Sequence, residues 1–207
     1  MKIGVLILGS LFKIGGYQVF AYNLMNRLST RNHEITLIVK SSEFRKNYNL
    51  YEQLPFKVAT IKNSDERLVK YFPYLAARSL RNFVVRNNIE VLQVVGSYPA
   101  GYVATSLKSP IPVVLRTHGE DVQVDKEIGY GLRLDNKMDK KIRKVLHSVD
   151  ILVALTSTMY DTYSELGISN DNISLVPNGV GVDDFNTEEK FNSISIRNKY
   201  NIKNDIP

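Results

Sequence analysis

Short runs of apolar residues alternate with stretches of helical periodicity along most of the chain. The first run, residues 3–8, is long enough for a buried strand and too short for most helices. We expect strands over residues 3–8, 34–39, 56–60, 89–95, 112–116, 150–154 and 173–176. Continuous apolar strands that alternate with helices are typical of parallel sheets covered on both faces. The pattern therefore predicts an α/β, Rossmann-like fold with a doubly wound, mostly parallel sheet of about seven strands.

The stretches between these runs carry helix signals. Apolar residues recur at helical spacing from residue 17 to residue 28, so a helix is expected to begin just after a Gly-Gly pair. The stretch before the fourth strand should be interrupted near Pro73, because proline cannot donate to the helical ladder. Ser97 is a candidate N-cap. We expect helices over 17–28, 66–87, 98–107, 137–147 and 157–166.

The same pattern divides the chain into one large domain and a short extension. Residues 1–190 contain all the expected strands and are predicted to form a single domain. Residues 191–207 are expected to contain one further helix, over 193–200, followed by a polar tail.

The composition excludes several classes of protein. None of the 207 residues is Cys, so neither a disulfide framework nor a Cys-ligated zinc site is possible. No stretch reaches the roughly 18 consecutive apolar residues that a membrane-spanning helix needs. Apolar residues make up 43% of the chain and charged residues 23%, which is ordinary for a globular protein. We expect a cytoplasmic protein, either in solution or peripherally bound to the inner face of a membrane.

The charge is moderately basic. A net charge of +6, from 27 basic and 21 acidic residues, suits a partner with phosphate groups or an anionic membrane surface. The charge is too weak and too dispersed to indicate nucleic acid. Two stretches, 67–86 and 126–144, are rich in Lys and Arg, and the first also contains Tyr71, Phe72 and Tyr74. Either stretch could lie on an anionic bilayer or could simply form a solvated helix face.

Polar residues follow four of the expected strands. Gly15 and Gly16 follow the first strand, and the segment containing Tyr98 follows the fourth. Residues 117–121 follow the fifth strand, and residues 178–180 follow the seventh. Because the carboxyl ends of parallel strands meet at one edge of the sheet, we expect these segments to line one cleft. Tyr98 is a candidate contact for a bound substrate there.

The glycine pair leaves two interpretations open. It places free backbone N–H groups and a helix dipole at the edge where α/β folds bind ligands. It could equally be a turn that needs a positive φ angle. Neither G-x-G-x-x-G nor G-x-x-x-x-G-K-S/T occurs, so the dinucleotide fingerprint and the P-loop are both excluded.

The segment at residues 117–121 offers the densest chemistry. It combines His118 with two carboxylates, Glu120 and Asp121, and a glycine that permits close approach to the backbone. The alternative is that His118 only hydrogen-bonds within its own loop. No metal site is expected, because no second His lies nearby and no Asp-x-Asp occurs.

These motifs together resemble those of glycosyltransferase family 4, also called group 1. The resemblance rests on the glycine pair before the helix, on Thr117-His118-Gly119 followed by Asp121, and on residues 149–156 (VDILVALT) and 173–180 (ISLVPNGV). It extends in order over nearly the whole chain. The Pro-Asn-Gly-Val sequence at 177–180 is its most specific part.

The resemblance implies a GT-B enzyme, in which two Rossmann-like domains face a cleft. Such enzymes are retaining, metal-independent transferases that take a sugar from a nucleotide-diphosphate sugar and need no cofactor. It implies an N-terminal, acceptor-binding domain for this chain, with a glycan or a lipid-linked acceptor. A nucleotide-sugar epimerase of the same fold and a non-catalytic binding module are the alternatives.

The resemblance also implies roles for individual residues. His118 would lie beside the transferred sugar at the reaction centre. The pair Gly15 and Gly16 would face the donor diphosphate or the reacting sugar. On the acceptor side would lie Glu120 and Asp121.

Two departures from the family pattern qualify the resemblance. Asn178 and Gly179 would shape the cleft, but Gly181 stands where the family usually has an aspartate. The chain also ends about where the family's donor-binding domain would begin. We therefore expect residues 191–207 to lead toward a donor domain that is absent from this chain, and this chain alone to be inactive.

Overall fold

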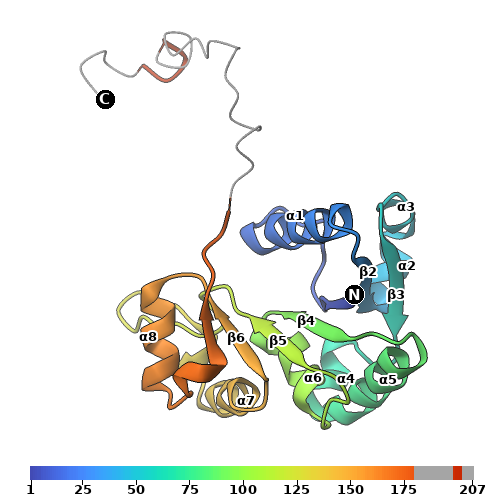
Figure 1. Ribbon diagram of the computed structural model, residues 1–207. Coiled ribbons are helices and arrows are strands. Elements are labelled where there is room, and N and C mark those ends of the chain that lie inside the picture. The colour runs from blue at the N-terminus through green and yellow to red at the C-terminus, as the bar shows by residue number, and fades with distance from the viewer. Residues whose placement is uncertain (180–197, 202–207) are drawn as a thin grey trace. The chain divides into compact units, whose positions relative to one another are not determined.

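Seven parallel strands form one sheet in the order β3-β2-β1-β4-β5-β6-β7 in the computed structural model, which describes residues 1–179 and 198–201 (Figure 1). The strands are β1 (Lys2–Leu6), β2 (Glu34–Lys40), β3 (Lys57–Ile61), β4 (Val91–Val95), β5 (Val113–Arg116), β6 (Ile151–Ala154) and β7 (Ile173–Leu175). Every pairing between neighbours in this sheet is parallel. The predicted α/β fold with a doubly wound sheet is confirmed.

The order of the strands reverses between β1 and β4. From β1 the chain moves outward to β2 and β3, then returns and continues from β4 to β7 on the other side. Right-handed crossovers place the helices of the two halves on opposite faces of such a sheet. The helices are α1 (Gly16–Thr30), α2 (Ser41–Lys46), α3 (Tyr48–Glu52), α4 (Glu66–Tyr71), α5 (Pro73–Arg86), α6 (Tyr102–Thr105), α7 (Asn136–Leu146) and α8 (Ser157–Glu165).

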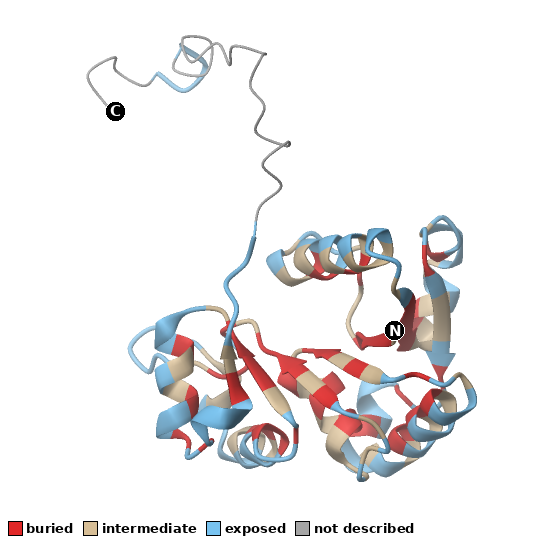
Figure 2. Ribbon diagram, viewed as in Figure 1, coloured by how far each residue is buried: buried red, intermediate tan, exposed pale blue. Residues whose placement is uncertain are grey.

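The core is split by the sheet into two apolar clusters, and the strands contribute to both (Figure 2). Along β4, Val94 belongs to the larger cluster with α4–α8, whereas Val95 belongs to the smaller cluster with α1–α3. This alternation follows from the two-residue repeat of a strand. Because helices cover both faces, β1 and β2 are buried along nearly their whole length.

Local signals explain where several helices begin and end. The Asp135 side chain accepts a hydrogen bond from the Met138 amide at the start of α7, and Thr156 caps α8 in the same way through Met159. Gly167 follows α8 with a φ of 83°, the left-handed conformation that commonly terminates a helix. The predicted interruption near Pro73 is confirmed, since α4 ends at Tyr71 and α5 starts at Pro73.

The segment after β4 differs from the prediction. A π-helical turn spans Ser97–Gly101, Tyr98 has extended backbone angles, and the Tyr98–Pro99 peptide is cis. Ser97 does not cap a helix, because its backbone amide and its hydroxyl both bond to Asp121. The regular helix α6 therefore begins only at Tyr102.

The chain divides into two units after Pro177, at residues 1–177 and 178–207. The second unit contains Asn178 and Gly179, both exposed, together with the described residues 198–201. The boundary predicted at residue 190 and most of the helix predicted over 193–200 lie outside the described residues. Among the described helices, none is both long and apolar enough to cross a membrane.

Candidate active site at the carboxyl edge of the sheet

The loops that follow β1, β4 and β5 are neighbours at one edge of the sheet. The first two flank the point where the strand order reverses, and β5 lies beside β4. Doubly wound sheets bind their ligands at this reversal, outside the carboxyl ends of the strands. The topology therefore brings the glycine pair and the segment at residues 117–121 to the same edge.

A buried carboxylate ties two of these loops together. One carboxylate oxygen of Asp121 accepts a hydrogen bond from the backbone N–H of Ser97, at 2.7 Å, and the other accepts from that of His118, at 2.8 Å. The Ser97 hydroxyl donates to the Asp121 carbonyl oxygen at 3.2 Å. Burial raises the pKa of Asp121, while the bonds from the two amides act in the opposite direction.

These contacts give Asp121 a positioning role within the loops. Its side chain is 7% exposed, and both of its oxygens already accept hydrogen bonds from the backbone. The acceptor contact expected of Asp121 stays a prediction. Glu120 beside it is exposed, and its backbone carbonyl accepts a hydrogen bond from Leu132.

His118 lies against two rings of α1. Its imidazole centroid is 5.6 Å from that of Tyr17 and 5.8 Å from that of Phe20. Its Nε2 atom is buried and has no hydrogen-bond partner among the described residues. Burial, and secondarily the nearby Arg116 charge, lower the pKa of His118 to about 4. The imidazole is therefore neutral at physiological pH.

Arg116, the last residue of β5, is a buried cation that the sequence did not reveal as part of the site. It is 4% exposed, and its guanidinium carbon lies 3.7 Å from the centroid of the Phe20 ring. A cation over a ring face is attracted by the ring quadrupole, and the attraction is strongest when water is excluded. Burial lowers the pKa of Arg116 to about 10, so the group is charged at neutral pH.

Gly15 and Gly16 differ in the space that a Cβ atom would have at each position. Gly15 is extended, with φ 179°, and a Cβ atom there would lie 2.4 Å from Oε1 of the buried Gln18. Gln18 is held in place by a hydrogen bond from its Nε2 to the Ser10 carbonyl. At Gly16 a Cβ would meet nothing within 4 Å. Since neither glycine has a φ in the left-handed region, the turn interpretation is wrong, and no contact with the described residues explains Gly16.

Three further residues, Tyr98, Asn178 and Gly179, were predicted to belong to the site. The half-buried ring of Tyr98 lies 5.9 Å from that of Tyr102, and Lys141 lies over both rings. Burial, and secondarily the charge of Glu66, raise the pKa of Tyr98. Asn178 and Gly179 belong to the second unit, so their predicted cleft-shaping role is untested.

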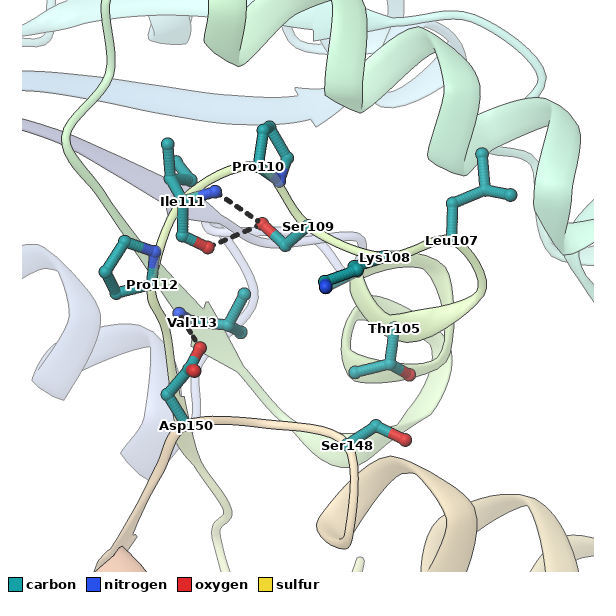
Figure 3. Close-up of a pocket in the computed structure, with 11 residues that line it drawn as sticks. Thr105, Leu107, Lys108, Ser109, Pro110, Ile111, Pro112, Val113, Ser148 and Asp150 are labelled. Carbon is teal, nitrogen blue, oxygen red and sulfur yellow. Dashed lines mark hydrogen bonds between the residues drawn. The ribbon is translucent and has the colours of Figure 1, made fainter.

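A hollow at the opposite, amino edge of the sheet is not part of this site (Figure 3). It has a volume of about 530 Å³ and is lined by residues such as Thr105, Lys108 and Asp150. The Asp150 carboxylate accepts a hydrogen bond from the Val113 amide at the start of β5. Among residues 1–179 and 198–201, no three His, Asp or Glu side chains are grouped as metal ligands.

Comparison with known proteins supplies the family. Residues 14–184 match the family described as Glycosyltransferase Family 4. The chain belongs to glycosyltransferase family 4. The match covers the glycine pair and the loops that follow β4 and β5. No curated protein matches the sequence.

Solved glycosyltransferases share the fold. Sucrose-phosphate synthase from Thermosynechococcus elongatus matches 100% of this chain with a TM-score of 0.69 and 12% identity, over 54% of its own length. A glycosyltransferase from Rickettsia africae matches 100% of the chain with a TM-score of 0.64 and 13% identity, over 51% of its length. Anabaena HepE, solved in complex with UDP, matches 97% with a TM-score of 0.67 and 14% identity, over 50% of its length.

This family 4 chain therefore spans about half the length of these enzymes. Its sheet is that of a GT-B glycosyltransferase domain, and its family places it as the N-terminal one.

Replacing Asp121 by Asn tests the tie between the loops. The Asn side chain would present its amino group to one of the two backbone amides and leave that N–H buried without an acceptor. We expect Asp121→Asn to lower the free energy of unfolding by about 2–4 kcal/mol, measured by urea denaturation. The matched control is Glu120→Gln next to it, which is exposed and should change stability by less than about 0.5 kcal/mol. Equal stability of the two variants would contradict the role of Asp121.

Proposed function

We propose that this chain is the acceptor-binding half of a retaining, metal-independent glycosyltransferase. The enzyme would move a sugar from a nucleotide-diphosphate sugar to a glycan or glycolipid acceptor, with a second domain that binds most of the donor. Family membership and the half-length match to GT-B enzymes support this assignment. No cofactor or resident metal is part of the proposal.

The neutral imidazole of His118 carries the proposal. It lies at the carboxyl edge, against the first two turns of α1, and part of the residue remains exposed to solvent. A neutral imidazole can donate a hydrogen bond at one nitrogen and accept at the other. We assign it to a hydroxyl group of the transferred sugar, which it would hold while the bond to the diphosphate breaks.

The N-terminus of α1 is suited to the departing diphosphate. The first turn of this helix contains no acidic residue that would compete with an anion. Free N–H groups and the helix dipole favour negative charge at such an end. Gly16, whose Cβ position is open, would let the phosphate or sugar approach the backbone closely. The HepE complexes with UDP and with UDP-glucose support a nucleotide sugar as the donor.

Two other functions are compatible with the fold. One is a nucleotide-sugar epimerase, and the other is a binding module that keeps the cleft without turnover. Transfer of label from a nucleotide sugar to an added acceptor, by a protein that carries this chain and the second domain, separates the transferase from both. This chain alone should show no transfer, because it supplies one wall of the proposed cleft.

Removing the imidazole should impair turnover without unfolding the protein. In the two-domain protein, His118→Ala is expected to reduce the rate of sugar transfer about a hundredfold, the range typical of a positioned catalytic side chain. His147→Ala is the matched control, because that exposed histidine bonds to the Leu166 carbonyl on another element. Near-normal transfer by folded His118→Ala would refute the assignment.

The glycine pair offers a test of donor approach. In the two-domain protein, Gly16→Val should weaken donor binding at least about tenfold while changing stability by less than about 0.5 kcal/mol, because a Cβ atom at this position has open space around it. Calorimetry with UDP-glucose and thermal denaturation give the two values. In contrast, Gly15→Ala should be destabilising, since its Cβ would collide with Gln18. Unchanged affinity in Gly16→Val would remove Gly16 from the site.

The proposal includes peripheral contact of this chain with an anionic membrane that carries the acceptor. The aromatic membrane patch consists of Leu68, Tyr71, Phe72 and Tyr74, which are all exposed at the junction of α4 and α5. Lys141 of α7 donates a hydrogen bond to the Lys70 carbonyl, so the two basic stretches meet beside this patch. Aromatic side chains with lysines are suited to the interface of an anionic bilayer.

Vesicle binding tests this patch. The chain should sediment with anionic phosphatidylglycerol vesicles and not with neutral phosphatidylcholine vesicles, and binding should weaken as salt is raised. The double variant Tyr71→Ser/Phe72→Ser should bind several-fold more weakly, because it loses most of the apolar contact. Val85→Ser, at an exposed apolar position elsewhere on α5, should bind normally. Equal binding by all variants would rule the patch out.

A further inference from the structure

A groove of about 500 Å³ lies between α5 and β3, the edge strand of the sheet. Three cations line it, Lys62, Arg78 and Arg86. No Asp or Glu is among its lining residues. None of the three cations forms an ion pair within residues 1–179 and 198–201. The groove is therefore a concentration of positive charge with no carboxylate to balance it.

The other lining groups include hydrogen-bonding amides, two hydroxyl groups, a leucine and one aromatic ring. Asn82 and Asn87 lie along the groove, and the half-buried Phe83 contributes to its wall. Asn87 is held by two contacts: its Nδ2 donates to the Phe83 carbonyl at 2.9 Å, and its Oδ1 accepts from Lys57 at 3.2 Å. Lys57 adds a further cation at this end of the groove.

The spacing of the polar groups is regular. Arg78, Asn82 and Arg86 are four residues apart on α5, so they follow one another along one face of the helix. With a rise of about 1.5 Å per residue, the two arginines are roughly 12 Å apart along the axis. Such a row suits an extended ligand with repeated negative charges better than a single small anion.

We propose that this groove binds an anionic oligosaccharide. The guanidinium groups would pair with its carboxylates or phosphates, for which their planar fork is matched. The Asn amides can donate to and accept from sugar hydroxyls, and the face of Phe83 can pack against a sugar ring. The ligand would be the part of the acceptor glycan that is remote from its reacting end, an identification that rests on the proposed function.

The position of the groove agrees with that identification. One end of the groove, at Lys62 after β3, lies at the carboxyl edge of the sheet, the same edge at which His118 follows β5, and the other end, at Asn87, lies beside the start of β3. Four strand spacings separate β3 from β5, which is about 19 Å at the usual distance between strands. An acceptor several sugars long would reach from the groove to the imidazole.

Direct binding tests the groove without any catalytic assay. The probe is a fluorescein-labelled hyaluronate octasaccharide, titrated with the 207-residue chain in low-salt buffer and followed by anisotropy. We expect binding that weakens with salt and that Arg78→Gln/Arg86→Gln weakens by about tenfold or more. Arg81→Gln removes the same charge from an exposed position on the same helix outside the groove, and it should change affinity less than about twofold.

Several outcomes would overturn the proposal. One is that the hyaluronate octasaccharide does not bind. Another is that Arg81→Gln weakens binding as much as Arg78→Gln/Arg86→Gln does. A third is that a labelled octaglutamate peptide or an octanucleotide binds as tightly as hyaluronate or more tightly. A neutral dextran octasaccharide should not bind. The proposed glycosyltransferase would survive any of these results if the two-domain protein still transfers sugar to an acceptor in a His118-dependent way.

Discussion

The hydrogen bonds of Asp121 are the constraint on which the candidate site depends. One carboxylate joins the backbone of the β4 loop at Ser97 to that of the β5 loop at His118. Both N–H groups would otherwise be buried donors, and a buried donor without an acceptor costs more than a typical hydrogen bond contributes. The bonds therefore hold the two loops together next to the point where the strand order reverses. They also fix the backbone position from which the His118 side chain projects.

Helix α1, which packs on the face of the sheet that holds the smaller apolar cluster, supplies further contacts to the site. Tyr17 and Phe20 lie against His118, and Phe20 also lies under the guanidinium of Arg116. The same covering that excludes water makes His118 neutral, because burial and a nearby cation both disfavour the imidazolium. The helix to which we assign the diphosphate is thus also the helix that sets the protonation state of the imidazole.

Much of the fold and part of the site could be predicted from the sequence. The strands and the edge where their loops meet follow from apolar runs and helical periodicity, which are local signals. The bond between Ser97 and Asp121 joins residues that are far apart in the chain, so Ser97 was wrongly expected to be a helix cap. Nor does sequence show that Arg116 is buried or that Gly15, unlike Gly16, is needed for packing.

Helix α1 packs against His118 and thereby keeps its imidazole neutral. A pH titration of the His118 imidazole by NMR measures this directly, with His118→Gln to assign the signal. We expect the imidazole to titrate with a midpoint near pH 4. As pH falls from about 6.5 toward 4, the unfolded chain would bind a proton at His118 that the folded chain does not, so the fold should lose stability over that range. A midpoint at or above about 6.5, the ordinary value for a histidine, would contradict the account.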